Sequence, residues 1–302
     1  MSDVIVEHIV KRYGDLTAVD DVSFSCDRGR IFALVGPDGA GKTSLFRSMC
    51  GLLDFAEGRV EIGGFDLVSN FTAVKDILGY MPQNFSLYPD LTVEENLRFY
   101  AGLFEINGKA FEEKREPLYA FSGLGSFRKR RAAKLSGGMK QKLALSCALI
   151  HDPKVLILDE PTTGVDPLSR RQFWQILRDL RDKGSCIIVS TPYMDEVELA
   201  DSAAFMHRGR KLAEGTPKEL TKLYDGAVYA VSVEPSYAMM ERINALERIS
   251  ARRFGASVHV YTPSDMGEAE LEGLLRQHDW QQAHIERISP ELEDVFIQLM
   301  GD

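Results

Sequence analysis

The stretch GPDGAGKTS, Gly36 to Ser44, has the residue types and spacing of a phosphate-binding loop. It fits the pattern G-x-x-x-x-G-K-[ST], and it lies between an apolar strand-like run, RIFALV, and a helix-like run, SLFRSMCGLL. Glycines let the backbone curl so that its N–H groups surround a phosphate chain at a helix N-terminus. Lys42 would then reach the outer phosphates, and the Thr43 hydroxyl would ligate Mg²⁺. The flanking strand and helix disfavour a glycine turn with only a structural role.

Two adjacent carboxylates end a second buried strand, in KVLILDEP, Lys154 to Pro161. Neighbouring residues of a strand point in opposite directions, so Asp159 and Glu160 cannot share one task. Asp159 suits a role in holding Mg²⁺ through water, and Glu160 suits a role in orienting or deprotonating the water that attacks a terminal phosphate. Strands often end in acidic residues, so the Asp-Glu pair alone does not indicate catalysis. Together with the phosphate loop it does.

A third stretch, LSGGMKQKLALSCALI, opens a helix at Ser136-Gly137-Gly138. A small hydroxyl and two glycines at a helix start form a second phosphate-binding end. One nucleotide does not need two such ends from one molecule. We therefore expect a dimer in which each chain offers this helix to the nucleotide of its partner.

These three stretches together resemble the ATP-binding subunits of ABC transporters, over about Val4 to Gly215. The motif LSGGMKQ, about twenty residues before the Asp-Glu strand, is the most specific part of the resemblance. The resemblance implies binding of ATP and Mg²⁺, with Glu160, Lys42 and Gln83 in catalysis and Thr43, Gln83 and Asp159 at the metal. The nucleotide-binding positions that it implies are Tyr13, Gly36, Pro37, Asp38, Gly39, Ala40, Gly41, Lys42, Thr43, Ser44, Gln83, Leu135, Ser136, Gly137, Gly138, Gln141, Asp159 and Asp166.

Three of these roles rest on the resemblance alone. Tyr13, in KRYGDLTAV, looks like the aromatic residue that stacks on adenine. Gln83, in GYMPQNFSLYPD, looks like the glutamine that contacts Mg²⁺ and relays the nucleotide state to the helical subdomain. Asp166, in TTGVDP, looks like the aspartate that contacts the partner chain. After Gln83, the helical subdomain with Phe85 and Tyr88 should offer the groove that receives a permease helix.

The sequence departs from the family pattern at the end of CIIVSTPYMDEVE, Cys186 to Glu198. Most members have a histidine after the Ser-Thr or Ser-Ser pair, and it hydrogen-bonds the terminal phosphate of ATP. Here the position is Pro192, whose ring has no donor or acceptor. Either proline is a tolerated variant, or the chain hydrolyses ATP slowly as half of an asymmetric pair. Milder departures are Asp38, where Asn is frequent, and Ser44, where Thr is frequent.

The elements that position these residues read as an α/β fold. Apolar runs such as RIFALVG, KVLILDE and SCIIVST alternate with amphipathic stretches, as expected of a mostly parallel sheet with helices on its faces. VIVEHIV, VDDVSFSC and GRVEIGG have period-two patterns that predict an antiparallel section. A helical subdomain at about 84–145 is inserted between strands, and Thr92 is a predicted N-cap within it. With the resemblance, the fold class is a P-loop ABC-type ATPase domain at 1–215.

Residues 216–302 read as a small C-terminal α+β domain with an accessory or regulatory role. Its strand, helix, strand, strand, helix, strand order is that of the ferredoxin-like unit. A final helix is predicted from Ser289-Pro290, with Leu292, Val295, Phe296 and Leu299 on one apolar face. The tail RISPELEDVFIQLMGD resembles that of subunits paired with exporter-type permeases of the drug, antibiotic and polysaccharide group.

Composition limits the remaining functions. The net charge of −9 argues against nucleic acid as a partner, because neutralising phosphates needs clustered Lys and Arg. The four cysteines have no paired spacing, as expected of buried thiols in a reducing cytoplasm. We see neither a signal peptide nor about 18 consecutive apolar residues, the length a spanning helix needs.

We therefore expect an ATPase subunit that is cytoplasmic and peripheral on the inner face of the cell membrane, held there by an integral membrane permease. Its second partner would be another ATP-binding subunit, identical or different. Two alternatives stay open. One is the hydrolysis-impaired half of an asymmetric pair, and the other is a soluble ABC ATPase of translation, repair or cofactor assembly. The sequence does not identify the cargo.

Overall fold

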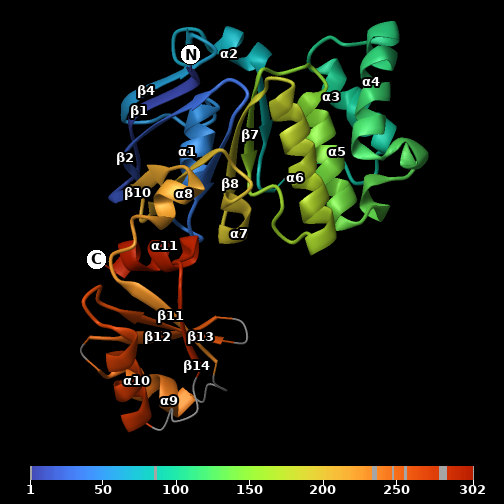
Figure 1. The fold of residues 1–302 in the computed structure, drawn as a ribbon. Coiled ribbons are helices and arrows are strands. Elements are labelled where there is room, and N and C mark those ends of the chain that lie inside the picture. The colour runs from blue at the N-terminus through green and yellow to red at the C-terminus, as the bar shows by residue number, and fades with distance from the viewer. Residues whose placement is uncertain are drawn as a thin grey trace. The chain divides into compact units, whose positions relative to one another are not determined.

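The computed structural model describes residues 2–84, 87–232, 237–246, 248–254, 257–278 and 284–301. By its internal contacts the chain divides into two units, Met1–Pro217 and Lys218–Asp302. Figure 1 shows the elements of both units along the chain. No helix in the described ranges has the length and apolar character needed to cross a membrane.

The central sheet of the first unit has the strand order β10-β9-β3-β8-β7-β6. Its strands are β3 (Ile31–Val35), β6 (Leu78–Met81), β7 (Val155–Asp159), β8 (Cys186–Thr191), β9 (Ser202–His207) and β10 (Arg210–Gly215). Neighbouring strands are parallel except β9 and β10. Every residue of β3, β7 and β8 is buried, because continuous apolar runs suit strands that are covered on both faces. The phosphate loop and the Asp-Glu pair lie at the carboxyl ends of the central strands β3 and β7.

A second, antiparallel sheet has the order β2-β1-β4-β5 and confirms the predicted antiparallel section. Its strands are β1 (Ser2–Tyr13), β2 (Leu16–Asp27), β4 (Glu57–Ile62) and β5 (Phe65–Asp66). Helix α1 (Lys42–Met49) packs against β1, β2 and β7, so one apolar core joins the two sheets through this helix (Figure 1). The four cysteines are all free and buried.

A group of helices lies between β6 and β7 in the sequence and beside them in the fold (Figure 1). It comprises α3 (Val93–Gly102), α4 (Gly108–Ser122), the short 3₁₀ turns Gly125–Phe127 and Ala132–Lys134, and α5 (Gly137–Leu149). These helices share a separate apolar cluster. Thr92 caps α3 as predicted: its hydroxyl accepts from the Glu95 N–H, and the Glu95 carboxylate accepts from the Thr92 N–H.

The remaining helices of the first unit flank its sheets. They are α2 (Phe71–Ile77), α6 (Pro167–Asp182) and α7 (Met194–Val197), while α8 (Pro217–Thr221) crosses the boundary between the units. Helix α6 packs against β3 and β8.

The second unit confirms the predicted ferredoxin-like order. Its elements are β11 (Ala227–Ser232), α9 (Tyr237–Asn244), β12 (Ser250–Phe254), β13 (Ser257–Thr262), α10 (Glu268–Gln277), β14 (His284–Ile288) and α11 (Leu292–Gly301). The antiparallel strands follow the order β12-β13-β11-β14, with each crossover helix between strands that are not neighbours. The last helix begins at Leu292, later than predicted from Ser289-Pro290, and Asp294 accepts the N–H of Glu291 just before it.

Candidate functional site

The loop Gly36–Ser44 joins β3 to α1, and two of its glycines are required by close backbone contacts. A Cβ on Gly36 would lie 2.1 Å from the carbonyl oxygen of Met206. Gly41 has φ +103°, and a Cβ there would lie 2.2 Å from the carbonyl oxygen of Ala18. Because both obstacles are backbone atoms, a side chain at either position would push the loop away from its neighbours.

Lys42 is buried at the first turn of α1 and points back across the loop. Its Nζ donates to the carbonyl oxygens of Gly36 at 2.7 Å and Pro37 at 3.0 Å. The same Nζ lies 3.1 Å from Oε1 of Glu160, and the two side chains are only 3% and 4% exposed. The lysine and the carboxylate that were predicted to act on a terminal phosphate are therefore in direct contact.

Glu160 follows β7 with φ +47°, an uncommon value for a residue with a side chain. Its Oε2 accepts from Nε2 of Gln83 at 2.9 Å and from the Thr163 hydroxyl at 3.3 Å. Its backbone N–H donates to the Ser190 hydroxyl at 2.9 Å. Strained backbone held by several hydrogen bonds is typical of functional sites.

Asp159, the last residue of β7, is fully buried. Its Oδ1 accepts from the Ser190 hydroxyl at 2.7 Å. Burial raises the pKa of Asp159, while the hydroxyls of Ser190 and Thr43 act to lower it. Its Oδ2 is buried and accepts no hydrogen bond of normal geometry within the described ranges. An orphaned carboxylate oxygen near a threonine hydroxyl fits Mg²⁺, which prefers hard oxygen ligands.

One open cavity of about 720 Å³ collects most of the predicted residues, and its size is within the range of small-molecule sites. The predicted residues that line it are Tyr13, Asp38, Gly39, Ala40, Gly41, Lys42, Thr43, Ser44, Gln83 and Glu160. Gly36 and Pro37 lie in the same loop and accept hydrogen bonds from Lys42, and Asp159 is buried.

Sequence reasoning missed part of this cavity. Leu16, Thr17 and Ala18 line it beside Tyr13, and Arg208 and Gly209 line it from the β9–β10 turn. Arg208 has φ +47°. The only signal in the sequence was a basic residue before a glycine, and such turns are common.

Tyr13 lies at the mouth of the cavity and is 45% exposed. Its hydroxyl is 3.4 Å from the Ser44 hydroxyl, and the Lys11 Nζ lies 4.9 Å from its ring centroid. The ring is thus available for stacking at the end of the cavity where the loop meets α1.

The residues of LSGGMKQ do not line this cavity. Ser136 caps α5 by accepting the Met139 N–H at 3.3 Å, and Gly138 packs on Ser169 of α6. Asp166 caps α6, and hydrogen bonds from Ser169 lower its pKa. Leu135 is buried in the helical cluster, and Gly137 is exposed at the start of α5.

Gln141 lines a second cavity, of about 490 Å³, together with Gln83. Gln83 therefore contacts both cavities.

At the end of β8, a buried carboxylate organises the loop that contains Pro192. Glu196 is 1% exposed and accepts from the hydroxyls of Thr162 at 2.7 Å and Thr191 at 2.5 Å. The Thr191 hydroxyl also accepts the Tyr193 N–H at 3.1 Å. The backbone around Pro192 is therefore fixed by its neighbours.

Comparisons with known proteins place this site in a family. The family model described as "ABC transporter" matches residues 19–163. The "Nod factor export ATP-binding protein I" of Rhizobium leguminosarum bv. viciae is 35% identical over 297 residues, which are 97% of this chain and 93% of that protein. The chain belongs to the ATP-binding subunits of ABC transporters.

Other relatives of this ABC chain differ in length. The "Probable multidrug ABC transporter ATP-binding protein YbhF" of Escherichia coli (strain K12) is 40% identical over 308 residues, which cover 100% of this chain and 53% of that protein. The chain thus spans about half the length of this relative. A solved structure titled "Structure of ATP binding subunit of ABC transporter" is 31% identical, with a TM-score of 0.66, over 72% of this chain and 92% of that one.

Proposed function

We propose that this chain binds and hydrolyses ATP to power an exporter-type ABC transporter through a separate membrane permease. The single observation that supports this most strongly is the convergence of Lys42, Gln83 and Glu160 in one cavity with the phosphate loop. The relatives are named for multidrug ABC transport and for Nod factor export, which favours export over import.

In this proposal the phosphate chain of ATP lies on the loop N–H groups, and the adenine ring stacks on Tyr13. Lys42 exchanges Glu160 for the outer phosphate oxygens. Glu160 is then free to accept a proton from the attacking water, while the amide of Gln83 holds its Oε2 in position. Thr43, Asp159 and Gln83 are the residues that would hold Mg²⁺, which neutralises phosphate charge when bound.

The proposed assembly is a head-to-tail dimer. The helix that begins at Ser136 would receive the partner's nucleotide, together with Leu135, Gly137, Gly138 and Gln141. This fits the absence of these residues from the cavity lined by their own chain's Lys42. Asp166 would contact the partner chain.

The permease would dock on the helical group beside the second cavity. Tyr88 and Phe99 are 43% and 40% exposed and stack edge to face with centroids 4.5 Å apart. Asn96 is buried and exchanges hydrogen bonds with the backbone N–H and carbonyl of Tyr88, which fixes this aromatic group. Phe85, also expected in this groove, lies outside the described residues. Docking here would place the chain on the inner face of the cell membrane, with 216–302 as an accessory domain.

The decisive measurement is steady-state phosphate release by the full chain with Mg²⁺ and ATP, compared with Glu160→Gln. Loss of a general base lowers turnover by roughly 10²- to 10⁴-fold. We expect turnover in the native chain, a loss of this size in the variant, and ATP binding in both. Equal turnover in the two proteins would refute the assigned role of Glu160.

A second candidate, favoured by Pro192, is that the chain is the slow half of an asymmetric pair. It requires a native chain that binds ATP but does not turn it over until mixed with a second ATP-binding subunit.

A further inference from the structure

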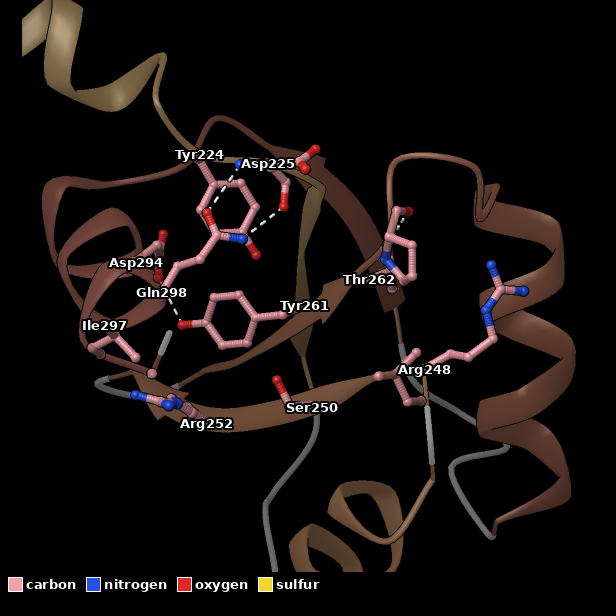
Figure 2. Close-up of a pocket in the computed structure, with 13 residues that line it drawn as sticks. Tyr224, Asp225, Arg248, Ser250, Arg252, Tyr261, Thr262, Asp294, Ile297 and Gln298 are labelled. Carbon is pink, nitrogen blue, oxygen red and sulfur yellow. Dashed lines mark hydrogen bonds between the residues drawn. The ribbon is translucent and has the colours of Figure 1, made fainter.

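The C-terminal unit contains a cavity of about 460 Å³ that the ATP site does not use (Figure 2). It opens on the face of the sheet opposite α9 and α10. Ala251 and Val260 belong to the cluster that packs under these helices. Their strand neighbours Ser250, Arg252 and Tyr261 must therefore point to the other face, where they line the cavity. Its volume is in the range of small-molecule sites.

Hydrogen bonds between distant segments hold the walls of this cavity in place. The Gln298 amide accepts the Asp225 N–H at 2.9 Å and donates to the Asp225 carbonyl at 2.7 Å, which ties α11 to the segment before β11. Asp294, on the same helix, accepts the Tyr261 hydroxyl at 2.7 Å. Figure 2 shows these contacts on one side of the cavity. The cavity is therefore formed before any ligand arrives, which lowers the ordering cost of binding.

Two arginines, Arg248 and Arg252, line this cavity, and they differ in their partners. Arg252 forms no ion pair and no hydrogen bond with the residues that the structure describes. Arg248, which also lines the cavity, differs because its guanidinium donates to both oxygens of Asp265 at 2.8 and 2.7 Å. The Ser250 hydroxyl, two residues before Arg252 on the same face of β12, makes no hydrogen bond in the described ranges either. A guanidinium beside a free hydroxyl is a receptor for a planar oxyanion.

Two tyrosine rings form the apolar side of the cavity. The centroids of Tyr224 and Tyr261 are 6.3 Å apart with the rings inclined at 45°, and both residues are half-buried. Burial raises the pKa of both tyrosines, and the positive charge of Arg252 opposes this rise. Half-buried aromatic rings beside a cation suit a ligand that combines a flat ring with a negative charge.

Two acidic residues line the cavity, the exposed Asp225 and the buried Asp294, and Asp294 does not compete for such a ligand. Asp294 is 2% exposed, and each of its oxygens already accepts a hydrogen bond, Oδ1 from Tyr261 and Oδ2 from the N–H of Glu291. Its carboxylate positions the Tyr261 ring.

We propose that this cavity is a binding site for a small aromatic carboxylate. The carboxylate pairs with Arg252 and accepts from Ser250, and the ring packs on Tyr224 and Tyr261. This site is independent of the ATP cavity, since every residue that lines it belongs to the second unit.

The test is calorimetric titration of the full chain with 2-naphthoate, in the presence of excess ATP. We expect saturable binding that weakens about tenfold or more in Arg252→Met, the loss expected for one charge-assisted pair. Arg252→Lys keeps the positive charge but cannot form two parallel hydrogen bonds to a carboxylate. Its affinity for 2-naphthoate should lie between those of the native chain and of Arg252→Met. The matched control is Arg276→Met, because Arg276 is exposed in the same unit and lies outside the cavity.

Two neutral or oppositely charged analogues complete the test. 2-Naphthalenemethanol and 2-naphthylmethylamine should each bind to the native chain about tenfold more weakly than 2-naphthoate. Neither analogue carries a carboxylate that can pair with Arg252. The proposal is overturned by absence of saturable naphthoate binding, by equal losses in Arg252→Met and Arg276→Met, or by an alcohol or amine that binds as well as the carboxylate. Thermal melts of each variant show that it is folded.

Discussion

Lys42 and Glu160 form a buried ion pair between the phosphate loop and the end of β7, with Nζ 3.1 Å from Oε1. Neither side chain is exposed enough for water to solvate its charge if the other is removed. Two groups that are assigned to different steps of ATP hydrolysis thus also stabilise each other in the fold.

Removing the lysine alone should therefore destabilise the protein. Breaking a buried pair leaves an uncompensated charge and costs roughly 3–5 kcal/mol. We expect Lys42→Met to lower the free energy of unfolding by about this amount, and Lys42→Met with Glu160→Gln to recover part of it. Denaturant unfolding without nucleotide measures both. Lys109→Met, at a site 89% exposed, is the control. Single and double variants of equal stability would contradict this account.

Asp159 should make stability depend on pH in a defined direction. Burial raises its pKa in the folded state, so its ionisation opposes folding. Its favourable contribution is present below the unfolded pKa, about 3.9, and is lost as pH rises through the folded pKa. With EDTA, Asp159→Asn should raise Tm at pH 7, and this gain should shrink towards pH 4. The exposed Asp90→Asn serves as the control. A gain that persists unchanged in acid would exclude this explanation.

Magnesium and ATP should reverse the order in which the native chain and Asp159→Asn melt. When Mg²⁺ and ATP are added, the native chain should gain Tm through binding to the folded state, whereas Asp159→Asn should gain less because it loses a metal ligand. Equal gains, measured by thermal melts on the same samples, would show that Asp159 does not contribute to the metal site.

Glu196 should stabilise the folded protein, although it has no assigned role in ATP hydrolysis. Glu196→Ala removes the shared acceptor of Thr162 and Thr191, and each orphaned hydroxyl costs about 1–3 kcal/mol. We expect a lower Tm, partly restored by Thr162→Val with Thr191→Val. Glu198→Ala, on the exposed side of the same segment, should change little. If the two alanine variants melt alike, the buried network is not stabilising.

Replacing Pro192 by histidine should change turnover by less than about tenfold, the factor that corresponds to ~1.4 kcal/mol. The reason is that Lys42, Gln83 and Glu160 already converge in the cavity, so a histidine adds only one polar contact. The measurement is phosphate release by the native chain and by Pro192→His at saturating ATP. A native chain that is inactive until Pro192→His restores turnover would instead favour the slow half of an asymmetric pair.

Much of the fold could be predicted because its signals are local and agree with one another. Buried runs such as IFALV and VLILD, the capping box at Thr92 and the alternation of strands and helices in the C-terminal unit all specify structure over a few residues. The start of α11 was predicted too early because Ser-Pro is a helix-start signal, whereas Asp294 satisfies the backbone at Glu291 instead.

The parts of the site that sequence reasoning missed depend on tertiary register. Glu196 meets Thr162 across 34 residues, and Arg208 reaches the cavity only because β9 lies next to β3. A buried glutamate and an exposed one look alike in sequence, so no local pattern separates Glu196 from Glu198. That Arg252 has no partner among the residues the structure describes is likewise visible only once the neighbours of β12 are known.

At Gly36 and Gly41 the nearest obstacle to a side chain is a backbone carbonyl oxygen, of Met206 and of Ala18 respectively. Consequently the loop glycines and Ala18, whose carbonyl oxygen faces Gly41, differ in how far their side chains can vary. Residue 18 is only half-buried, so it can change its side chain while still presenting the same carbonyl oxygen, but positions 36 and 41 cannot accept even a methyl group. A saturation library across positions 18, 36 and 41 should therefore tolerate several residues at the first position and essentially one at each of the other two.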